Sequence, residues 1–256
     1  MEQYTAGRAA AERADTSYRG ISARLRFAQK PGHGVPAYTR WINRGLARSV
    51  AALCASWGWS ANMVSAVSAV VSLAGLLLLL LLPVAPLTGL LVAVLLAAGY
   101  VLDSADGQVA RVTGTGSRAG EWLDHVIDSA RTPAVHLCVA VGFIHFYGSD
   151  AWQWWLPLLY CVVSTCHFMS QILAEQLLRP TAAPSPSAPV PRGSVARSLV
   201  MLHTDTGILC WMFLIWGFAP LFLGFYLLMF AANTLTSIVS MTRKFRMLSL
   251  TERSTS

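Results

Sequence analysis

Charge is scarce in this chain of 256 residues. The 19 Lys and Arg and 12 Asp and Glu residues make up 12% of the sequence, about half of the roughly 25% found in soluble domains. Hydrophobic residues account for 55%. A soluble globule of this size needs more charge to cover its surface, so the composition excludes an ordinary cytosolic enzyme and disfavours disorder. We expect the chain in a membrane.

Charged residues are missing altogether from four stretches: 49–102, 132–149, 151–174 and 206–242. A membrane-spanning helix needs about 20 apolar residues, so the sequence predicts an all-α, polytopic membrane protein with six transmembrane helices. The fifth has the shortest apolar stretch and can also be read as a tilted or partly embedded helix. The expected helices lie at about 62–82, 87–112, 118–146, 152–176, 204–217 and 219–242.

The first 50 residues lack the apolar core of a signal peptide, so neither cleavage nor secretion is expected. Residues 1–34 are expected to be a flexible cytoplasmic segment. Over 35–59, apolar residues recur at near-helical spacing among arginines, which predicts an amphipathic juxtamembrane helix on the inner leaflet. The alternative is a helix packed on a neighbouring protein face. The six-helix domain would follow over 60–242, interrupted by a Pro- and Ser-rich loop at 180–197, and a cytoplasmic tail over 243–256.

Lys and Arg are absent from the three turns expected on one side of the membrane, at 83–86, 146–152 and 216–220. This asymmetry predicts that both termini face the cytoplasm. The net charge of +7 comes without a zinc-finger or aromatic-basic motif, so nucleic acid is not an expected partner. The excess of Arg over Lys and the abundance of Ala weakly favour a bacterial plasma membrane. Five cysteines without a CxxC pair are typical of core residues rather than of a disulfide or zinc framework.

The informative charges are four aspartates. Asp103 and Asp106 are three residues apart, and Asp124 and Asp128 are four apart, so each pair lies on one helix face. In an antiparallel hairpin both pairs reach the same depth, where four carboxylates would repel one another unless cations neutralised them. Ligands that are all oxygen favour magnesium, or manganese, over zinc.

Three further residues point to phosphate chemistry. Gly107 and Gly120 remove side chains where a ligand could approach a helix backbone, and Arg111 offers a fixed cation for a phosphate. Two ions bridged by carboxylates beside an arginine suit in-line displacement at a pyrophosphate.

These residues resemble a known family. Asp103, Asp106, Gly107, Ala110, Arg111, Gly120, Asp124 and Asp128 match the signature D-x2-D-G-x2-A-R-x8-G-x3-D-x3-D of the CDP-alcohol phosphotransferases. Residues 60–65 resemble the family's T/S-P-N-x-V/I-T/S segment, with Ala61 where the family usually has Pro.

The resemblance implies transfer of a phosphoalcohol from a CDP-linked lipid donor, commonly CDP-diacylglycerol, to an acceptor hydroxyl with release of CMP. It implies that the four aspartates bind two divalent ions and that Asp128 is also the catalytic base. It implies a homodimer as well. The donor-binding residues would be Asn62, Ser65, Asp103, Asp106, Gly107, Ala110 and Arg111.

The acceptor is less clearly encoded. A charge at Arg131 is costly within a helix unless it meets an anion, so one hypothesis is that Arg118 and Arg131, with Arg192 and Arg197 from the following loop, bind a phosphate on the acceptor. The alternative is that Arg131 pairs with Asp128 or Asp205. We favour a small polyol phosphate, such as inositol phosphate or glycerol phosphate, and a plain alcohol stays open.

Two other functions compete with this one. Intramembrane prenyltransferases also hold magnesium on acidic motifs, but they use two widely separated motifs, whereas this sequence has one acidic cluster. A transporter would need acidic or polar residues near midmembrane and internal repeats, and the sequence shows neither a repeat nor a charge deep in the last three expected helices.

Overall fold

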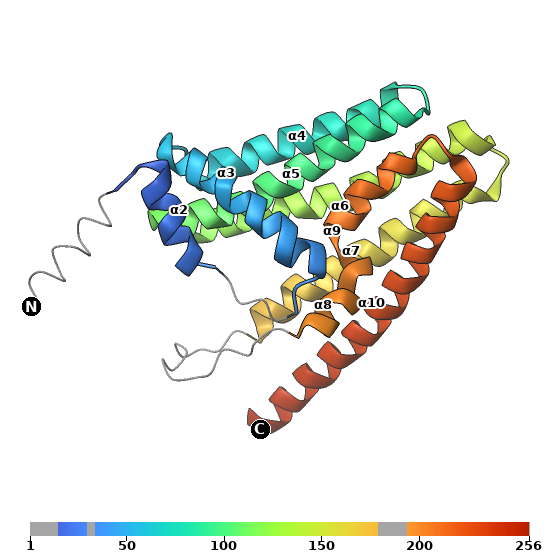
Figure 1. The fold of residues 1–256 in the computed structure, drawn as a ribbon. Helices are drawn as coiled ribbons and strands as arrows, with labels where there is room; N and C mark the ends of the chain where they lie inside the picture. Colours follow the sequence, from blue (N-terminus) through green and yellow to red (C-terminus); the bar gives the residue numbers. More distant parts are fainter. Residues whose placement is uncertain (1–14, 30–33, 179–193, 256) are drawn as a thin grey trace, which may run out of the picture. The chain divides into compact units, whose positions relative to one another are not determined.

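A computed structural model describes residues 15–29, 34–178 and 194–255, and within these ranges the regular elements are helices (Figure 1). The prediction of an all-α chain is confirmed for this part. The expected loop at 180–197 lies mostly outside the described residues. In chain order the elements are α2 (Tyr18–Phe27), η1 (Thr39–Asn43), α3 (Arg44–Ser56), α4 (Ala61–Leu81), α5 (Pro86–Thr113), α6 (Arg118–Tyr147), η2 (Trp152–Trp154), α7 (Trp155–Leu177), α8 (Val195–Val200), η3 (Met201–Thr204), α9 (Thr206–Met212), η4 (Phe213–Ile215) and α10 (Ala219–Thr255).

Four of the described helical segments are long and apolar enough to cross a membrane: α4, α5, α7 with η2, and α10 up to Leu250. The segments Val195–Thr204 and Thr206–Ile215 meet at a bend of 49° and would make a fifth span if they cross together. Helix α6 does not belong to this set, because its first half carries charges and its charge-free part runs only from 132 to 147. Six spans therefore stay a prediction, and four to five are supported.

Local sequence signals explain where the long helices begin and end. The Ser60 hydroxyl accepts from the Met63 N–H at 3.3 Å and caps α4, so this helix begins at the family segment although Ala61 replaces Pro. Pro86 opens α5, a position where its missing N–H has no helical partner. Gly114, with φ of 70°, provides the left-handed residue that ends α5.

Part of the segment 1–34, which was expected to be flexible, is helical. Helix α2 occupies Tyr18–Phe27, and the Ser17 hydroxyl caps it by accepting from Gly20 N–H. Ile21 and Leu25 are 2% and 0% exposed, so the helix is anchored by apolar contacts. The sequence analysis missed it because two buried positions among polar and arginine residues give a weak periodic signal.

The predicted juxtamembrane helix corresponds to η1 and α3. Its inner positions Ala47 and Ala51 are fully buried, while Trp41, Leu46 and Leu53 are exposed. An exposed apolar face is what an interfacial helix requires, and its position on a membrane surface stays a prediction.

By its contacts the chain divides into two compact units, and α4, α5, α6 and α9 contribute residues to both. The first unit comprises Met1–Leu73, Leu95–Val126 and Arg192–Gly207. Its core joins α2, α3, the start of α4 and the end of α5. Small residues on α3 allow close packing in this core, whose buried members are Ile21, Leu25, Ala47, Ala51, Ala52, Cys54, Val64, Ala105 and Val109.

The second unit comprises Ala74–Val94, Ile127–Pro191 and Ile208–Ser256, and aromatic rings fill its core. His136 Nδ1 lies 2.6 Å from the Tyr226 hydroxyl, and the His136 ring stacks on Tyr160 with centroids 4.1 Å apart. Gly142 is required beside Trp216, because a Cβ there would overlap the indole ring. His136 is thus a core residue whose polar ring atom has a hydrogen-bond partner.

Candidate active site

Three of the four motif aspartates come together in the first unit. One carboxylate oxygen each from Asp103, Asp106 and Asp124 lies within 4.8 Å of the other two. Asp103 and Asp106 stand one turn apart on α5, and Asp124 stands on α6. Three carboxylates at this spacing repel one another, and a hard divalent cation with oxygen ligands would relieve that repulsion. The donor set therefore fits magnesium or manganese.

Asp106 is the most enclosed of the three, with 6% of its surface exposed. The Ser65 hydroxyl of α4 donates to Asp106 Oδ2 at 2.5 Å, and the Gly107 N–H donates to Oδ1. Both bonds leave lone pairs on the carboxylate for a cation. Ser65, predicted as a donor-binding residue, is here the residue that orients Asp106.

The start of α4 also reaches α6. A Cβ placed on Gly120 would lie 3.2 Å from Asn62 Oδ1, tighter than most real contacts. Gly120 therefore lets the Asn62 amide approach α6 one turn before Asp124. The predicted donor-binding residue Asn62 on α4 therefore lies against the turn of α6 that precedes Asp124 of the acidic cluster.

Arg111, the basic residue of the motif, lies about one turn beyond Asp106 on α5. The Arg111 Nε donates to the Ala28 carbonyl at 3.1 Å, and its Nη1 would lie 3.4 Å from a Cβ on Gly107. Ala110 precedes Arg111 on the same helix and is half-buried. The guanidinium thus lies over the glycine of the motif.

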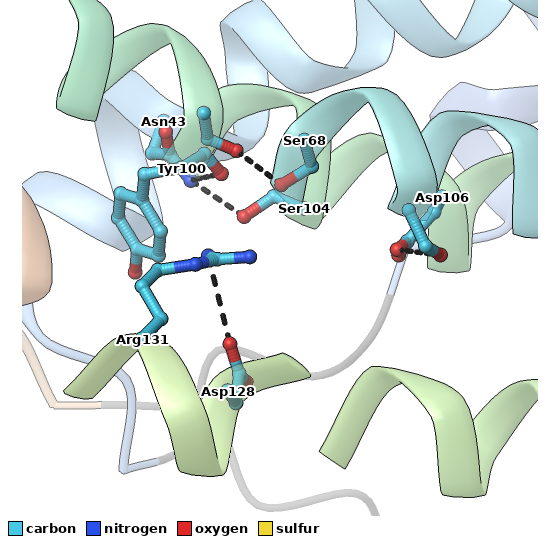
Figure 2. A network of polar contacts seen from close by, with 9 residues as sticks. Asn43, Ser68, Tyr100, Ser104, Asp106, Asp128 and Arg131 are labelled. Atoms are coloured by element: carbon cyan, nitrogen blue, oxygen red, sulfur yellow. Dashed lines mark hydrogen bonds and ion pairs between the residues drawn. The ribbon is translucent and has the colours of Figure 1, made fainter. Parts of the chain in front are cut away.

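The fourth aspartate has a different setting. Asp128 follows Asp124 by one turn on α6, falls in the second unit and is not a member of the three-carboxylate group found among the described residues. Its Oδ1 lies 3.5 Å from Arg131 Nη1 (Figure 2). The ion pair with Asp128 that the sequence analysis left open for Arg131 is therefore present. Asp205, the other candidate partner, accepts from Thr39 and Gly207 instead.

The remaining predicted acceptor residues are more dispersed along the chain. Arg118 is the first residue of α6 and is exposed. Arg197 lies on α8, where its backbone N–H donates to the Ser194 hydroxyl at 3.4 Å. Arg192 lies outside the described residues.

Sequence reasoning missed a polar network behind the motif in the first unit. Asn43 is fully buried, and its Nδ2 donates to the Ser104 hydroxyl at 2.6 Å (Figure 2). The Thr39 hydroxyl lies 2.6 Å from the Tyr100 hydroxyl and donates to Asp205 Oδ1 at 2.7 Å. Thr39 and Asn43 are the first and last residues of η1, a π-helical turn. Such turns are frequent at functional sites. The one sequence signal for this network is Asn43, a polar residue on the apolar side of the helix predicted at 35–59.

A family model for CDP-alcohol phosphatidyltransferases matches residues 59–239, well over half of the 256-residue chain. The chain belongs to this family. No curated protein matches it. Members are phosphotransferases, and the apolar helices together with the family identify an integral membrane protein. The matched range contains the whole aspartate motif and leaves α2, η1 and α3 outside.

Proposed function

We propose that this protein transfers a phosphatidyl-type group from CDP-diacylglycerol, or a similar CDP-linked lipid, to a hydroxyl of a small polyol phosphate, such as inositol phosphate or glycerol phosphate, and releases CMP. The observation that carries the proposal is the cluster of Asp103, Asp106 and Asp124 oxygens within 4.8 Å of one another, next to Gly107 and Arg111. The family membership supplies the class of reaction.

In this proposal Asp103, Asp106, Asp124 and Asp128 would hold two magnesium or manganese ions. Such ions, when bound, neutralise the diphosphate and its leaving group. Asn62, Gly107, Ala110 and Arg111 would bind the cytidine diphosphate, with Ser65 keeping Asp106 in place. The enclosed position of Asp106 and the approach of Arg111 to Gly107 and of Asn62 to Gly120 support this arrangement.

The chemistry is a displacement at phosphorus. The acceptor hydroxyl oxygen forms a new bond to the phosphorus that carries the lipid alcohol, and the bond from that phosphorus to the CMP oxygen breaks. Asp128 takes the hydroxyl proton, and CMP leaves with the electron pair of the broken bond. The ion pair with Arg131 would keep Asp128 ionised and able to accept that proton.

A phosphorylated acceptor is favoured by the basic residues. Arg131 stands one turn along α6 from Asp128, the base of this proposal, and only 11% of its side chain is exposed. Its planar guanidinium carries five N–H donors, so it can bind an acceptor phosphate oxygen in addition to Asp128. Arg118, Arg197 and Arg192 would add to the attraction for the acceptor phosphate.

The test uses the purified full-length protein in liposomes with CDP-diacylglycerol and magnesium. Inositol phosphate, glycerol phosphate, inositol and glycerol are supplied one at a time, and CMP and the lipid product are identified by mass spectrometry. A phosphatidyl polyol phosphate with one molecule of CMP per product is expected. A product formed only with a plain alcohol would overturn the acceptor class, and no CMP with any acceptor would overturn the proposed function.

Arg131→Ala separates acceptor from donor binding in the same assay. The KM for the acceptor should rise roughly tenfold or more, the scale of a lost charged hydrogen bond, while the KM for the donor stays near the wild-type value. An equal rise for both substrates would remove Arg131 from the acceptor site.

A further inference from the structure

The arginine of the motif is held from outside the region that matches the family. Arg111 has a long flexible side chain, and its innermost donor, Nε, is bound to the Ala28 carbonyl at 3.1 Å. This contact joins residues 83 positions apart in the chain. With Nε fixed, the two outer nitrogens of the planar fork can point in few directions, and Nη1 lies against Gly107.

Ala28 is itself fixed by the end of α2. Its N–H donates to the Arg24 carbonyl at 3.2 Å and closes the helix. The apolar face of α2 is buried, with Leu25 fully enclosed in the core that also contains Ala105 and Val109 of α5. The carbonyl that holds Arg111 therefore belongs to a packed element.

A second contact links the same two segments. Gln29 Nε2 donates to the Leu25 carbonyl at 2.7 Å and to Gln108 Oε1 at 2.9 Å. Gln108 is 1% exposed, and its own Nε2 donates to the Arg44 carbonyl at 3.4 Å. A buried amide is costly unless both ends are bonded, and here both ends are used to tie α5 to the residues before α4.

Gln108 and Arg111 are three residues apart on α5, so they share one side of the helix. Gln108 accepts a hydrogen bond from Gln29, and Arg111 donates one to Ala28, the residue next to Gln29. The pair of contacts forms a clasp, by which we mean the Gln29–Gln108 hydrogen bond together with the Arg111–Ala28 hydrogen bond. Loss of the first would leave the Ala28 carbonyl held by α2 alone.

We propose that this clasp positions Arg111 for the diphosphate of the CDP-linked donor and that Gln108 and Gln29 are positioning residues for donor binding. The inference rests on the proposed function, since it takes Arg111 as a donor-binding residue. It assigns a role in the site to the end of α2, a helix that lies before the matched residues 59–239.

Gln108→Ala and Gln29→Ala test the clasp in the full-length protein. Each should raise the KM for CDP-diacylglycerol about three- to tenfold, the effect of one lost hydrogen bond, with the acceptor KM and kcat near the wild-type values. The dissociation constant for CDP in the presence of magnesium, measured by calorimetry, should rise by the same factor. Arg26→Gln is the matched control, because Arg26 is an exposed residue of the same helix, and it should change neither quantity.

The Arg111→Ala variant shows whether Gln108 acts through Arg111 or only supports the fold. If Gln108 acts through Arg111, adding Gln108→Ala to that variant should leave the CDP dissociation constant unchanged. An equal weakening in both backgrounds, or wild-type donor KM in Gln108→Ala, would overturn the inference while CMP release by the wild type still supports the proposed function. Absence of CMP release by the wild type is the separate result that overturns the proposed function.

Discussion

The Ser65 hydroxyl holds the most enclosed carboxylate of the site, that of Asp106. Its bond to Asp106 Oδ2 sets the direction in which that carboxylate presents its free lone pairs. A hydrogen bond to a charged group contributes about 1.5–3 kcal/mol, so its loss should matter more to cation binding than to folding.

Ser65→Ala should therefore lower kcat/KM roughly tenfold and raise the magnesium concentration needed for half-maximal activity. Magnesium titration of CMP release measures both. Ser68→Ala is the control, because Ser68 is a buried serine one turn further along α4 and donates to the Gly99 carbonyl. If both variants show the same magnesium requirement as the wild type, Ser65 does not orient a metal ligand.

Asp128 has a cation beside it, because its Oδ1 lies 3.5 Å from Arg131 Nη1. Asp128→Asn keeps the size of the side chain and removes its basicity, so CMP release should fall at least about a hundredfold, the usual contribution of a general base. Glu121→Gln makes the same chemical change three residues before Asp124 on α6, outside the motif, and should leave the rate near that of the wild type. Wild-type CMP release in the Asp128 variant would exclude the residue as base.

The aspartate spacing predicted that four acids would converge on α5 and α6, because helical periodicity fixes faces without knowledge of the tertiary fold. Asp103, Asp106 and Asp124 do lie together, whereas Asp128 is not a member of this group among the described residues. The roles of Ser65 toward Asp106 and of Gln108 toward Gln29 could not be predicted, since both bonds join helices whose rotation about their axes the sequence does not specify.

Helices α4 and α5 approach each other closely at Gly99. A Cβ at this position would overlap the Ser72 hydroxyl and lie 3.3 Å from the Ser68 carbonyl, and Ser68 donates to the Gly99 carbonyl at 2.8 Å. Small residues at such crossings permit backbone contact between membrane helices. The pair α4–α5 also carries Ser65 and Asp106, so its packing sets their separation.

Gly99→Ala should destabilise the protein by about 1–3 kcal/mol, the usual cost of overpacking. Thermal unfolding in detergent, followed by tryptophan fluorescence, should show a lower midpoint, and adding Ser72→Ala should restore part of the loss. Gly224→Ala in α10 is the control, since a Cβ there meets nothing within 4 Å. An unchanged midpoint in Gly99→Ala would mean that the two helices are further apart than described.

The bounds of the long helices were predictable to within a few residues where charge, proline or glycine marks an end. Helix α4 was expected at 62–82 and spans Ala61–Leu81, and α5 was expected at 87–112 and spans Pro86–Thr113. The fifth predicted helix failed to form one straight element. Residues 201–215 instead contain η3, α9 and η4, because Asp205 leaves the helical path and its carboxylate accepts from Thr39 and from Gly207.

The distribution of charge along the whole chain bears on how it crosses the membrane. Arg111 and Arg118 flank the turn between α5 and α6, whereas residues 83–86, 146–152 and 216–220 contain no Lys or Arg. Positive residues are retained on the cytoplasmic side. With six crossings, these three turns without Lys or Arg would all face away from the cytoplasm, and the turn at 114–117 would face it together with both termini.

Single cysteines at Val84, Ser149, Phe218 and Thr115 test this arrangement with a membrane-impermeant thiol reagent applied to intact cells. We expect labelling above the level of the unmodified protein at the first three positions, and at Thr115→Cys only after the membrane is permeabilised. The Phe218 variant decides the number of crossings, because the bent segment 195–215 must cross for residue 218 to reach the outer side. Protection of Phe218→Cys together with labelling of Val84→Cys would reduce the count below six and leave that segment as one that enters and returns on the same side.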